Sequence, residues 1–362
     1  MNYREKLRYF VLFGILFLII YLFVATKPLH KEFFLQTENS IHLTNEDKNI
    51  NLTDFASQNE GENFYPFRLK EFAGYFTESG KIIFAKKIPY KATLTDSFWT
   101  FYENNSESIE IKNVDETVLT TINAEGFPFL QKDRIYLLPP GGNSICEYTV
   151  SGARKWIYES YVPITAFNSS QKGAVIGFAD GAFVCLAPDG KELFAFYPGG
   201  SSNEIILGAA ISETENLAAC LSGINKQRFV LTSFDDSKHK VVFHEYLRSD
   251  LRQRCIVKFS KNSNYVYFQY DGGLGIVDCK KLKSTHIALK GTITQIEELE
   301  AQNLTLVLAH KNNRYFVYML ENANNLMGSF SFEANSAFIT PTPSGFFVGH
   351  DTKISKFNID RK

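Results

Sequence analysis

The feature that most constrains this chain is a short strand-turn-strand pattern that recurs along its length. The clearest copy runs from Ala174 to Tyr197, where the turn signals Asp180-Gly181 and Pro188-Asp189-Gly190 separate runs rich in Val, Phe, Leu and Ala. Glycine tolerates the positive φ of tight hairpin turns, and proline fixes the φ that other turn positions need. The stretch therefore predicts three antiparallel strands of one sheet.

Seven units of this kind can be placed after residue 67. They start near Ile82, Phe127, Ile164, Ile206, Cys255, Thr294 and Ala337, at intervals of 45, 37, 42, 49, 39 and 43 residues. This spacing is typical of the four-stranded blades of a β-propeller and not of helical repeats. The 33 Phe and 18 Tyr residues also favour strands, since aromatic side chains fit a pleated, half-buried surface.

The last unit supplies three strands, which would leave an unfavourable open edge. A strand-like segment at 69–77 lies upstream of the first unit, and we expect it to complete the last blade. The fold prediction is therefore all-β, a seven-bladed β-propeller over 67–362. Six or eight blades remain alternatives, because the first unit is irregular around 86–96.

The N-terminal segment predicts a membrane anchor. Residues 9–25 carry no charge, which suits a transmembrane helix, and a cleaved signal peptide is the alternative. Three basic residues precede this run and Lys27 and Lys31 follow it, which favours a cytoplasmic N-terminus over 1–8. Residues 26–66 are polar and read as a tether. The expected location is the bacterial inner membrane, with the propeller in the periplasm or outside.

Motifs for chemistry are missing from the sequence. The five cysteines (Cys146, Cys185, Cys220, Cys255 and Cys279) form no CxxC and are interpreted as small buried hydrophobes, with a disulfide between neighbouring blades as the alternative. The seven histidines include no HExxH, and His239 and His244 flank a strand without forming a metal pair. We therefore assign no catalytic, cofactor-binding or metal-binding residue and expect no cofactor.

A few remaining groups have two interpretations. The carboxylate pairs at 235–236 and 297–298 are assigned to turns and strand ends that meet water, against a glycosidase pair. The loops 139–143 and 198–202 join strands and could shape one rim of the ring. Phe98, Trp99, Phe101 and Tyr102 are assigned to the core, against an exposed recognition patch. The interaction surface stays unassigned.

Two runs, 145–158 (ICEYTVSGARKWIY) and 183–197 (FVCLAPDGKELFAFY), resemble the PQQ-like (quinoprotein) repeat, in which a Gly-containing turn leads to an outer strand with an aromatic residue. A third run, 257–278, is similar to WD-repeat propellers. Quinoprotein dehydrogenases stack tryptophans and hold a quinone with calcium, whereas this chain has only Trp99 and Trp156 and no Asp/Asn-rich calcium loop. The resemblance thus implies a membrane-anchored member without a cofactor, comparable to the propeller lipoprotein of the bacterial outer-membrane assembly machinery.

The sequence favours one class of function over another. The formal net charge of −1 argues against a nucleic-acid partner, because phosphate binding usually leaves a basic surface. We expect a non-enzymatic, membrane-anchored scaffold that binds protein partners in an extracytoplasmic envelope complex. The alternative is an extracytoplasmic propeller enzyme, or a sugar- or cofactor-binding protein, that uses the central channel.

Overall fold

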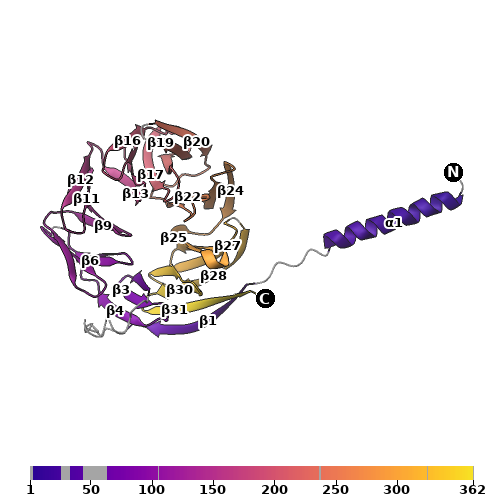
Figure 1. Cartoon of the computed structure of the whole chain (residues 1–362), viewed down its shortest axis with the longest axis horizontal. Coiled ribbons are helices and arrows are strands. Elements are labelled where there is room, and N and C mark those ends of the chain that lie inside the picture. The colour runs from indigo at the N-terminus through magenta and orange to yellow at the C-terminus, as the bar shows by residue number, and fades with distance from the viewer. Residues whose placement is uncertain are drawn as a thin grey trace. The chain divides into compact units, whose positions relative to one another are not determined.

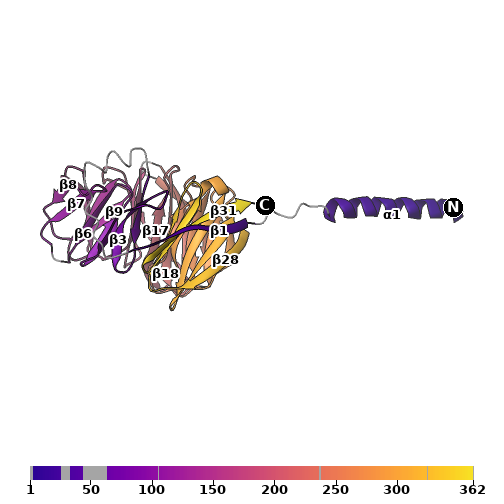
Figure 2. The ribbon, with the colours of Figure 1, turned by 90° about the horizontal axis from the view of Figure 1, so that it is seen from below.

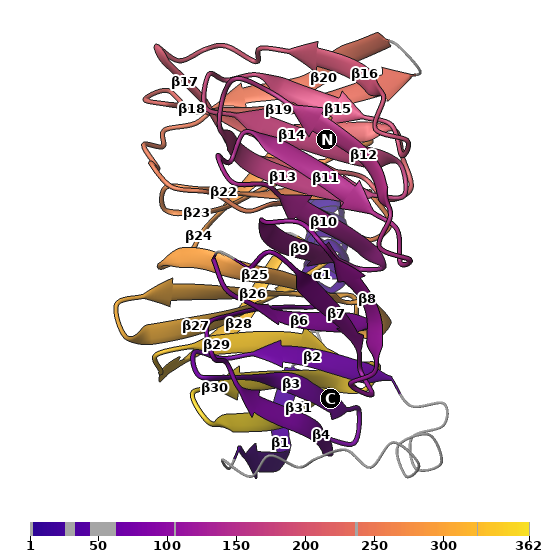
Figure 3. The same cartoon turned by 90° about the vertical axis from the view of Figure 1, so that its left-hand side faces the viewer.

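The computed structural model describes residues 3–25, 33–43, 63–104, 106–235, 238–323 and 325–361. The chain divides into two compact units, one formed by 1–36 with 359–362 and the other by 37–358. The larger unit is a ring of antiparallel sheets (Figure 1). Seen from the side, the sheets stand next to one another around the ring (Figures 2 and 3).

Eight sheets are present in the described residues, and we number them as blades 1–8 in chain order. Blade 1 has three strands and the others have four. The strands of blades 1–4 are β2 (Phe64–Arg68), β3 (Phe72–Thr77) and β4 (Ile82–Lys87); β5 (Lys91–Leu94), β6 (Phe98–Tyr102), β7 (Ile109–Asn113) and β8 (Val118–Ile122); β9 (Phe127–Gln131), β10 (Arg134–Leu138), β11 (Ser144–Tyr148) and β12 (Arg154–Glu159); and β13 (Ile164–Ser170), β14 (Gly173–Phe178), β15 (Phe183–Leu186) and β16 (Glu192–Phe196).

The second half of the ring repeats this order. The strands of blades 5–8 are β17 (Asn203–Ile211), β18 (Leu217–Ile224), β19 (Arg228–Asp235) and β20 (Lys238–Tyr246); β21 (Val257–Phe259), β22 (Tyr265–Tyr270), β23 (Gly273–Asp278) and β24 (Lys283–Ala288); β25 (Thr292–Leu299), β26 (Leu304–Lys311), β27 (Arg314–Glu321) and β28 (Asn325–Glu333); and β29 (Ala337–Pro341), β30 (Gly345–His350) and β31 (Lys353–Arg361), with β1 (Phe33–His42) as the fourth strand of blade 8. A 3-10 turn, η1 (Glu300–Gln302), connects β25 to β26.

The prediction of seven blades is wrong, because the segment counted as the first unit contains strands of two blades. Residues 82–87 form β4, the outer strand of blade 1, and blade 2 begins only at Lys91. Strand β5 has one buried residue in four, so it lacks the buried apolar run that marks the equally short β15. From blade 3 onward the predicted units coincide with the observed blades, and the stretch 174–197 holds strands β14, β15 and β16 in antiparallel register as expected.

The strand that closes the ring also differs from the expected one. Residues 69–77 contribute β3, a central strand whose six residues are all buried, whereas β1 pairs with β31 at the outer edge of blade 8. Strand β1 lies within the predicted tether 26–66. Its side chains are mostly exposed, so it lacks the apolar alternation that identifies a half-buried strand. The rest of the predicted tether, 26–32 and 44–62, lies outside the described residues.

The core lies between neighbouring blades. Tyr136 and Trp156 of blade 3 pack against Phe167 of blade 4, with the rings of Tyr136 and Phe167 centred 4.8 Å apart. The ring is sealed in the same way, since Phe76 of blade 1 meets Phe347 of blade 8 edge-on at 4.7 Å. Aromatic pairs of this kind add to the stabilisation that area burial supplies.

Because successive strands of a blade run in opposite directions, the loops that join them lie on two opposite faces of the ring. In a four-stranded blade, the turns between strands one and two and between strands three and four lie on one face, which we call the turn face. The turns between strands two and three, together with the connections between four-stranded blades, lie on the other, which we call the connection face. Side chains in loops of the same face can therefore contact one another, whereas loops of opposite faces are separated by the length of the strands.

The smaller unit contains α1 (Tyr3–Ala25). Spanning a bilayer takes about 20 consecutive apolar residues, and in the described part of the chain no helix has both the length and the apolar character for this. The predicted transmembrane helix over 9–25 is therefore not supported. The same correction applies to the inner-membrane location, with 1–8 in the cytoplasm and the propeller outside.

Candidate functional sites

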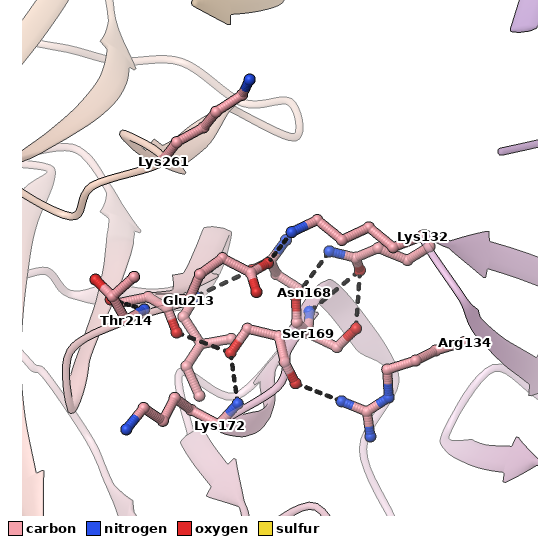
Figure 4. Close-up of polar contacts among 12 residues, drawn as sticks. Lys132, Arg134, Asn168, Ser169, Lys172, Glu213, Thr214 and Lys261 are labelled. Atoms are coloured by element: carbon pink, nitrogen blue, oxygen red, sulfur yellow. Dashed lines mark hydrogen bonds and ion pairs between the residues drawn. The ribbon is translucent and has the colours of Figure 1, made fainter. Parts of the chain in front are cut away.

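The turn face carries a network of polar contacts that joins successive blades. Gln131, at the end of β9, donates from Nε2 to the Ser169 carbonyl at 2.8 Å and accepts a hydrogen bond from the Ser169 hydroxyl at 3.0 Å (Figure 4). Arg134 forms an ion pair with the buried Glu147 of its own blade and donates to the Ser170 carbonyl of the next. Blades 3 and 4 are thus fixed to each other through side chains.

The network continues around the ring through hydroxyl groups. The Ser170 hydroxyl donates to the Ser212 carbonyl at 2.8 Å, and the Ser212 and Ser263 hydroxyls lie 2.6 Å apart. Lys132 of blade 3 reaches Glu213 of blade 5, with Nζ 2.7 Å from the carboxylate, and so passes over blade 4 (Figure 4). The donors and acceptors of this network bind one another, which indicates that most of these residues have a structural role.

A pocket of about 490 Å³ opens on the turn face between blades 6 and 7, and we call it the 6–7 pocket. Its wall is formed by Ser260, Lys261, Asn262, Tyr265, Tyr267, Glu298, Leu299, Glu300, Asn303, Leu304, Thr305, Asn322 and Ala323. The volume lies within the range of small-molecule sites, about 300–1,000 Å³. Only three of these thirteen residues are aliphatic, so the wall is unusually polar for such a site.

Blade 6 fixes the Glu298 carboxylate of blade 7. The Tyr267 hydroxyl donates to Oε1 at 3.1 Å, and the Lys261 backbone N–H donates to Oε2 at 2.8 Å. The Tyr267 hydroxyl also lies 3.2 Å from that of Thr305. Burial and the neighbouring Glu298 raise the pKa of Tyr267 far above its usual range, so its phenol remains a hydrogen-bond donor.

The mouth of the pocket is charged. The Lys261 ammonium lies 3.0 Å from the Glu300 carboxylate, and both side chains are about two-thirds exposed. Asn303 donates from Nδ2 to Oδ1 of Asn322 on the other side of the mouth. The backbones of Asn303, Asn322 and Ala323 are left-handed, with φ of 55°, 50° and 65°. Such conformations are costly for alanine and tend to gather at functional sites.

The connection face differs from the turn face in the aromatic side chains that are exposed on it. Tyr161 is fully exposed between blades 3 and 4, and Tyr197 and Tyr246 are more than half exposed at the next two connections. Phe127, where β9 begins after the connection from blade 2, is partly exposed. Four consecutive connections therefore each present an aromatic side chain.

The loops singled out in the sequence lie on this face and shape it. The Asn143 carbonyl, in loop 139–143, accepts from the Ser160 N–H at 3.0 Å, and the Asn143 amide donates back to the Ser160 carbonyl at 2.5 Å. In loop 198–202, the Pro198 carbonyl accepts from the Arg228 guanidinium at 2.5 Å. Both loops hold an inter-blade connection against a neighbouring hairpin.

Other residues weighed in the sequence have structural positions. Phe98 and Trp99 are buried, which confirms the core assignment for these two, whereas Phe101 and Tyr102 are half-buried. His239 stacks on Phe194 and Phe196 at 4.8 Å. All five cysteines are free, so the alternative of an inter-blade disulfide is wrong. Burial raises the pKa of Cys185, Cys255 and Cys279 to about 12.

The carboxylate pair at 297–298 lies at the end of β25, as predicted, but it is less exposed to water than expected. Both side chains are half-buried, and they face different partners because successive residues of a strand alternate in direction. Glu297 lies 3.0 Å from the Lys258 ammonium, while Glu298 lines the 6–7 pocket. Residue Asp236 of the other pair lies outside the described residues. Within the part of the chain that is described, no three His, Cys, Asp or Glu residues gather as metal ligands would.

Comparison with known proteins agrees with the fold. A family model described as a β-propeller protein matches residues 1–362. The chain belongs to this β-propeller family. An uncharacterized protein of Treponema pallidum (strain Nichols) is 32% identical to this β-propeller over 365 residues, which cover 99% of this chain and 96% of that protein.

Two solved propellers are similar in structure. The crystal structure of BamB from Moraxella catarrhalis has a TM-score of 0.59 and 13% identity, and the match covers 90% of this chain and 100% of that one. The Dos1 propeller has a TM-score of 0.56 and 10% identity, covering 90% and 95%. At these identities the likeness shows the fold alone. The predicted resemblance is thus confirmed at the level of the propeller superfamily.

Proposed function

We propose that this β-propeller is a non-enzymatic scaffold that binds protein partners through its connection face. The observation that carries the proposal is the series of exposed aromatic side chains, Phe127, Tyr161, Tyr197 and Tyr246, on four consecutive connections. Aromatic residues dominate the binding energy of protein interfaces, since each supplies a large contact area at low cost in side-chain entropy. Their repetition along one face argues for a shared role.

The anchoring of these side chains supports the same function. The Tyr197 hydroxyl donates to Asp180 at 3.3 Å, and the Arg228 guanidinium lies 5.4 Å from the centre of the Tyr246 ring. The connection that carries Tyr161 is held by the paired hydrogen bonds between Asn143 and Ser160. Surfaces ordered before binding lose less conformational entropy when a partner arrives.

Site-specific photocrosslinking in the cells that make the protein tests this proposal. A photoreactive phenylalanine analogue is placed at Tyr161, Tyr197 or Tyr246 in the full chain, and crosslinked proteins are identified by mass spectrometry. Val118 and Val150 are the matched controls, because both are about half exposed but lie next to turns of the turn face.

The proposal requires that the same protein is recovered from at least two tyrosine positions and from neither valine position. Replacing all three tyrosines by serine should then abolish its recovery by affinity purification at native expression. Equal crosslinking from both faces, or none from the tyrosine positions, would overturn it.

A further inference from the structure

The 6–7 pocket offers a second binding site, on the face opposite to the proposed protein-binding surface. We infer that it binds a neutral carbohydrate, with Glu298 accepting hydrogen bonds from sugar hydroxyls. This inference does not depend on the proposed scaffold function.

The Glu298 carboxylate keeps room for hydrogen bonds from a ligand. Its two oxygens receive one protein donor each, from Tyr267 and from the Lys261 backbone. An ionised carboxylate offers about four acceptor positions, so acceptor capacity remains. Because Tyr267 and the backbone hold the carboxylate in place, a ligand hydroxyl would meet an acceptor that is already oriented.

The charges around the pocket limit the class of ligand. The Lys261 ammonium and the Glu300 carboxylate pair with each other at the mouth, and the Glu298 carboxylate inside disfavours a phosphate or another anion. An uncharged ligand that both donates and accepts hydrogen bonds avoids this repulsion and leaves the ion pair intact. Sugar hydroxyls do this, and they complement the amides, hydroxyls and carboxylates of the wall.

The remaining wall suits the apolar side of a sugar ring. Tyr265 is half-buried and lines the pocket, so part of its ring is accessible to C–H groups. Leu299, Leu304 and Ala323 complete the apolar part.

Saturation-transfer-difference NMR on the purified full chain provides the test. The probes are D-glucose, D-galactose, D-mannose and N-acetyl-D-glucosamine, each at about 10 mM, a concentration that detects millimolar dissociation constants. We expect saturation transfer to the ring protons of at least one sugar. Glu298→Gln should weaken its binding about tenfold, as expected for the loss of a charged hydrogen-bond acceptor.

Glu297→Gln is the matched control, since it removes a carboxylate from the adjacent position of β25, where Glu297 pairs with Lys258 outside the pocket wall. The affinity of Glu297→Gln for the same sugar should stay within about twofold of that of the wild type. If Glu298→Gln unfolds at lower temperature, Asn322→Gly replaces it, because glycine keeps the left-handed backbone and removes from the mouth an exposed amide together with its hydrogen bond from Asn303. Lack of transfer from all four sugars, or equal weakening by the two glutamate variants, would overturn the inference.

Discussion

Gly190 lies so close to Trp156 that a Cβ built on the glycine would come within 2.4 Å of the indole Cγ. The glycine belongs to the turn between β15 and β16, and the tryptophan to the outer strand of blade 3. A turn of blade 4 thus packs against blade 3 through a position that has no room for a side chain.

Gly190→Ala should therefore lower the free energy of unfolding by about 2–5 kcal/mol, because it combines the cost of a left-handed alanine with overpacking against the indole. Gly272→Ala is the control, since Gly272 has a similar φ of 98° but no atom within 4 Å of its Cβ position. That change should cost only about 1–2 kcal/mol. Urea unfolding of both variants measures the difference, and equal losses would show that the contact with Trp156 does not matter.

The ion pair of Arg134 and Glu147 should be important for stability. Their side chains are only 11% and 5% exposed, so Arg134→Met leaves a buried carboxylate with Lys155, at 3.3 Å, as its remaining cation. We expect a loss of about 3–5 kcal/mol. Arg314→Met breaks a pair that is 52% and 74% exposed and should cost less than about 1 kcal/mol. Chemical denaturation that gave the same small loss for both would contradict this prediction.

His350 should make stability depend on pH. Burial lowers the pKa of this imidazole, and Lys353 and His42 lower it further, against an opposing effect of Asp351. The unfolded chain therefore takes up the proton first as pH falls. Stability should be complete above the ordinary histidine pKa, about 6.5, and should decline below it. His350→Gln lacks this pH-dependent contribution. The difference in the free energy of unfolding between wild type and His350→Gln should therefore shrink as the pH is lowered from 7 to 5. If this difference were the same at pH 7 and pH 5, His350 would not contribute to the pH dependence of stability.

Removal of β1 should open the ring. The strand is held to β31 by contacts that include the Ser40 and Ser355 hydroxyls at 2.9 Å and the Lys356 ammonium and Glu38 carboxylate at 2.9 Å. A chain starting at residue 43 exposes the edge of β31 and should unfold at lower temperature and associate with itself. A chain starting at Phe33 keeps the strand and serves as control. Calorimetry and sedimentation velocity distinguish the two outcomes.

Local patterns account for the parts of the fold that were predicted correctly. In the stretch 174–197, buried runs alternate with turns that contain Gly181 and Gly190, whose φ values of 88° and 85° favour glycine. Such turns act over a few residues, so they can be recognised without knowledge of the rest of the chain. The blades from β9 onward could be located for this reason.

The blade count and the closing strand depended on other information. Strand β5 has only one buried residue in four, and β1 is exposed and polar, so neither has the buried apolar run by which strands such as β15 can be recognised. Strand β1 is defined by its backbone pairing with β31, more than 300 residues away in the chain. A pairing partner at that distance leaves no trace in the local pattern.

The candidate sites, like the blade count, depend on contacts between residues that are far apart in the sequence. Backbone preferences and apolar periodicity act locally, so the amino-acid sequence was sufficient to predict a propeller and most of its turns. The contact of Glu298 with Tyr267 across two blades, and the position of four exposed aromatic residues on one face, emerged from the folded ring. The residues of each site come from different blades, and the closed ring of antiparallel sheets is what brings them together.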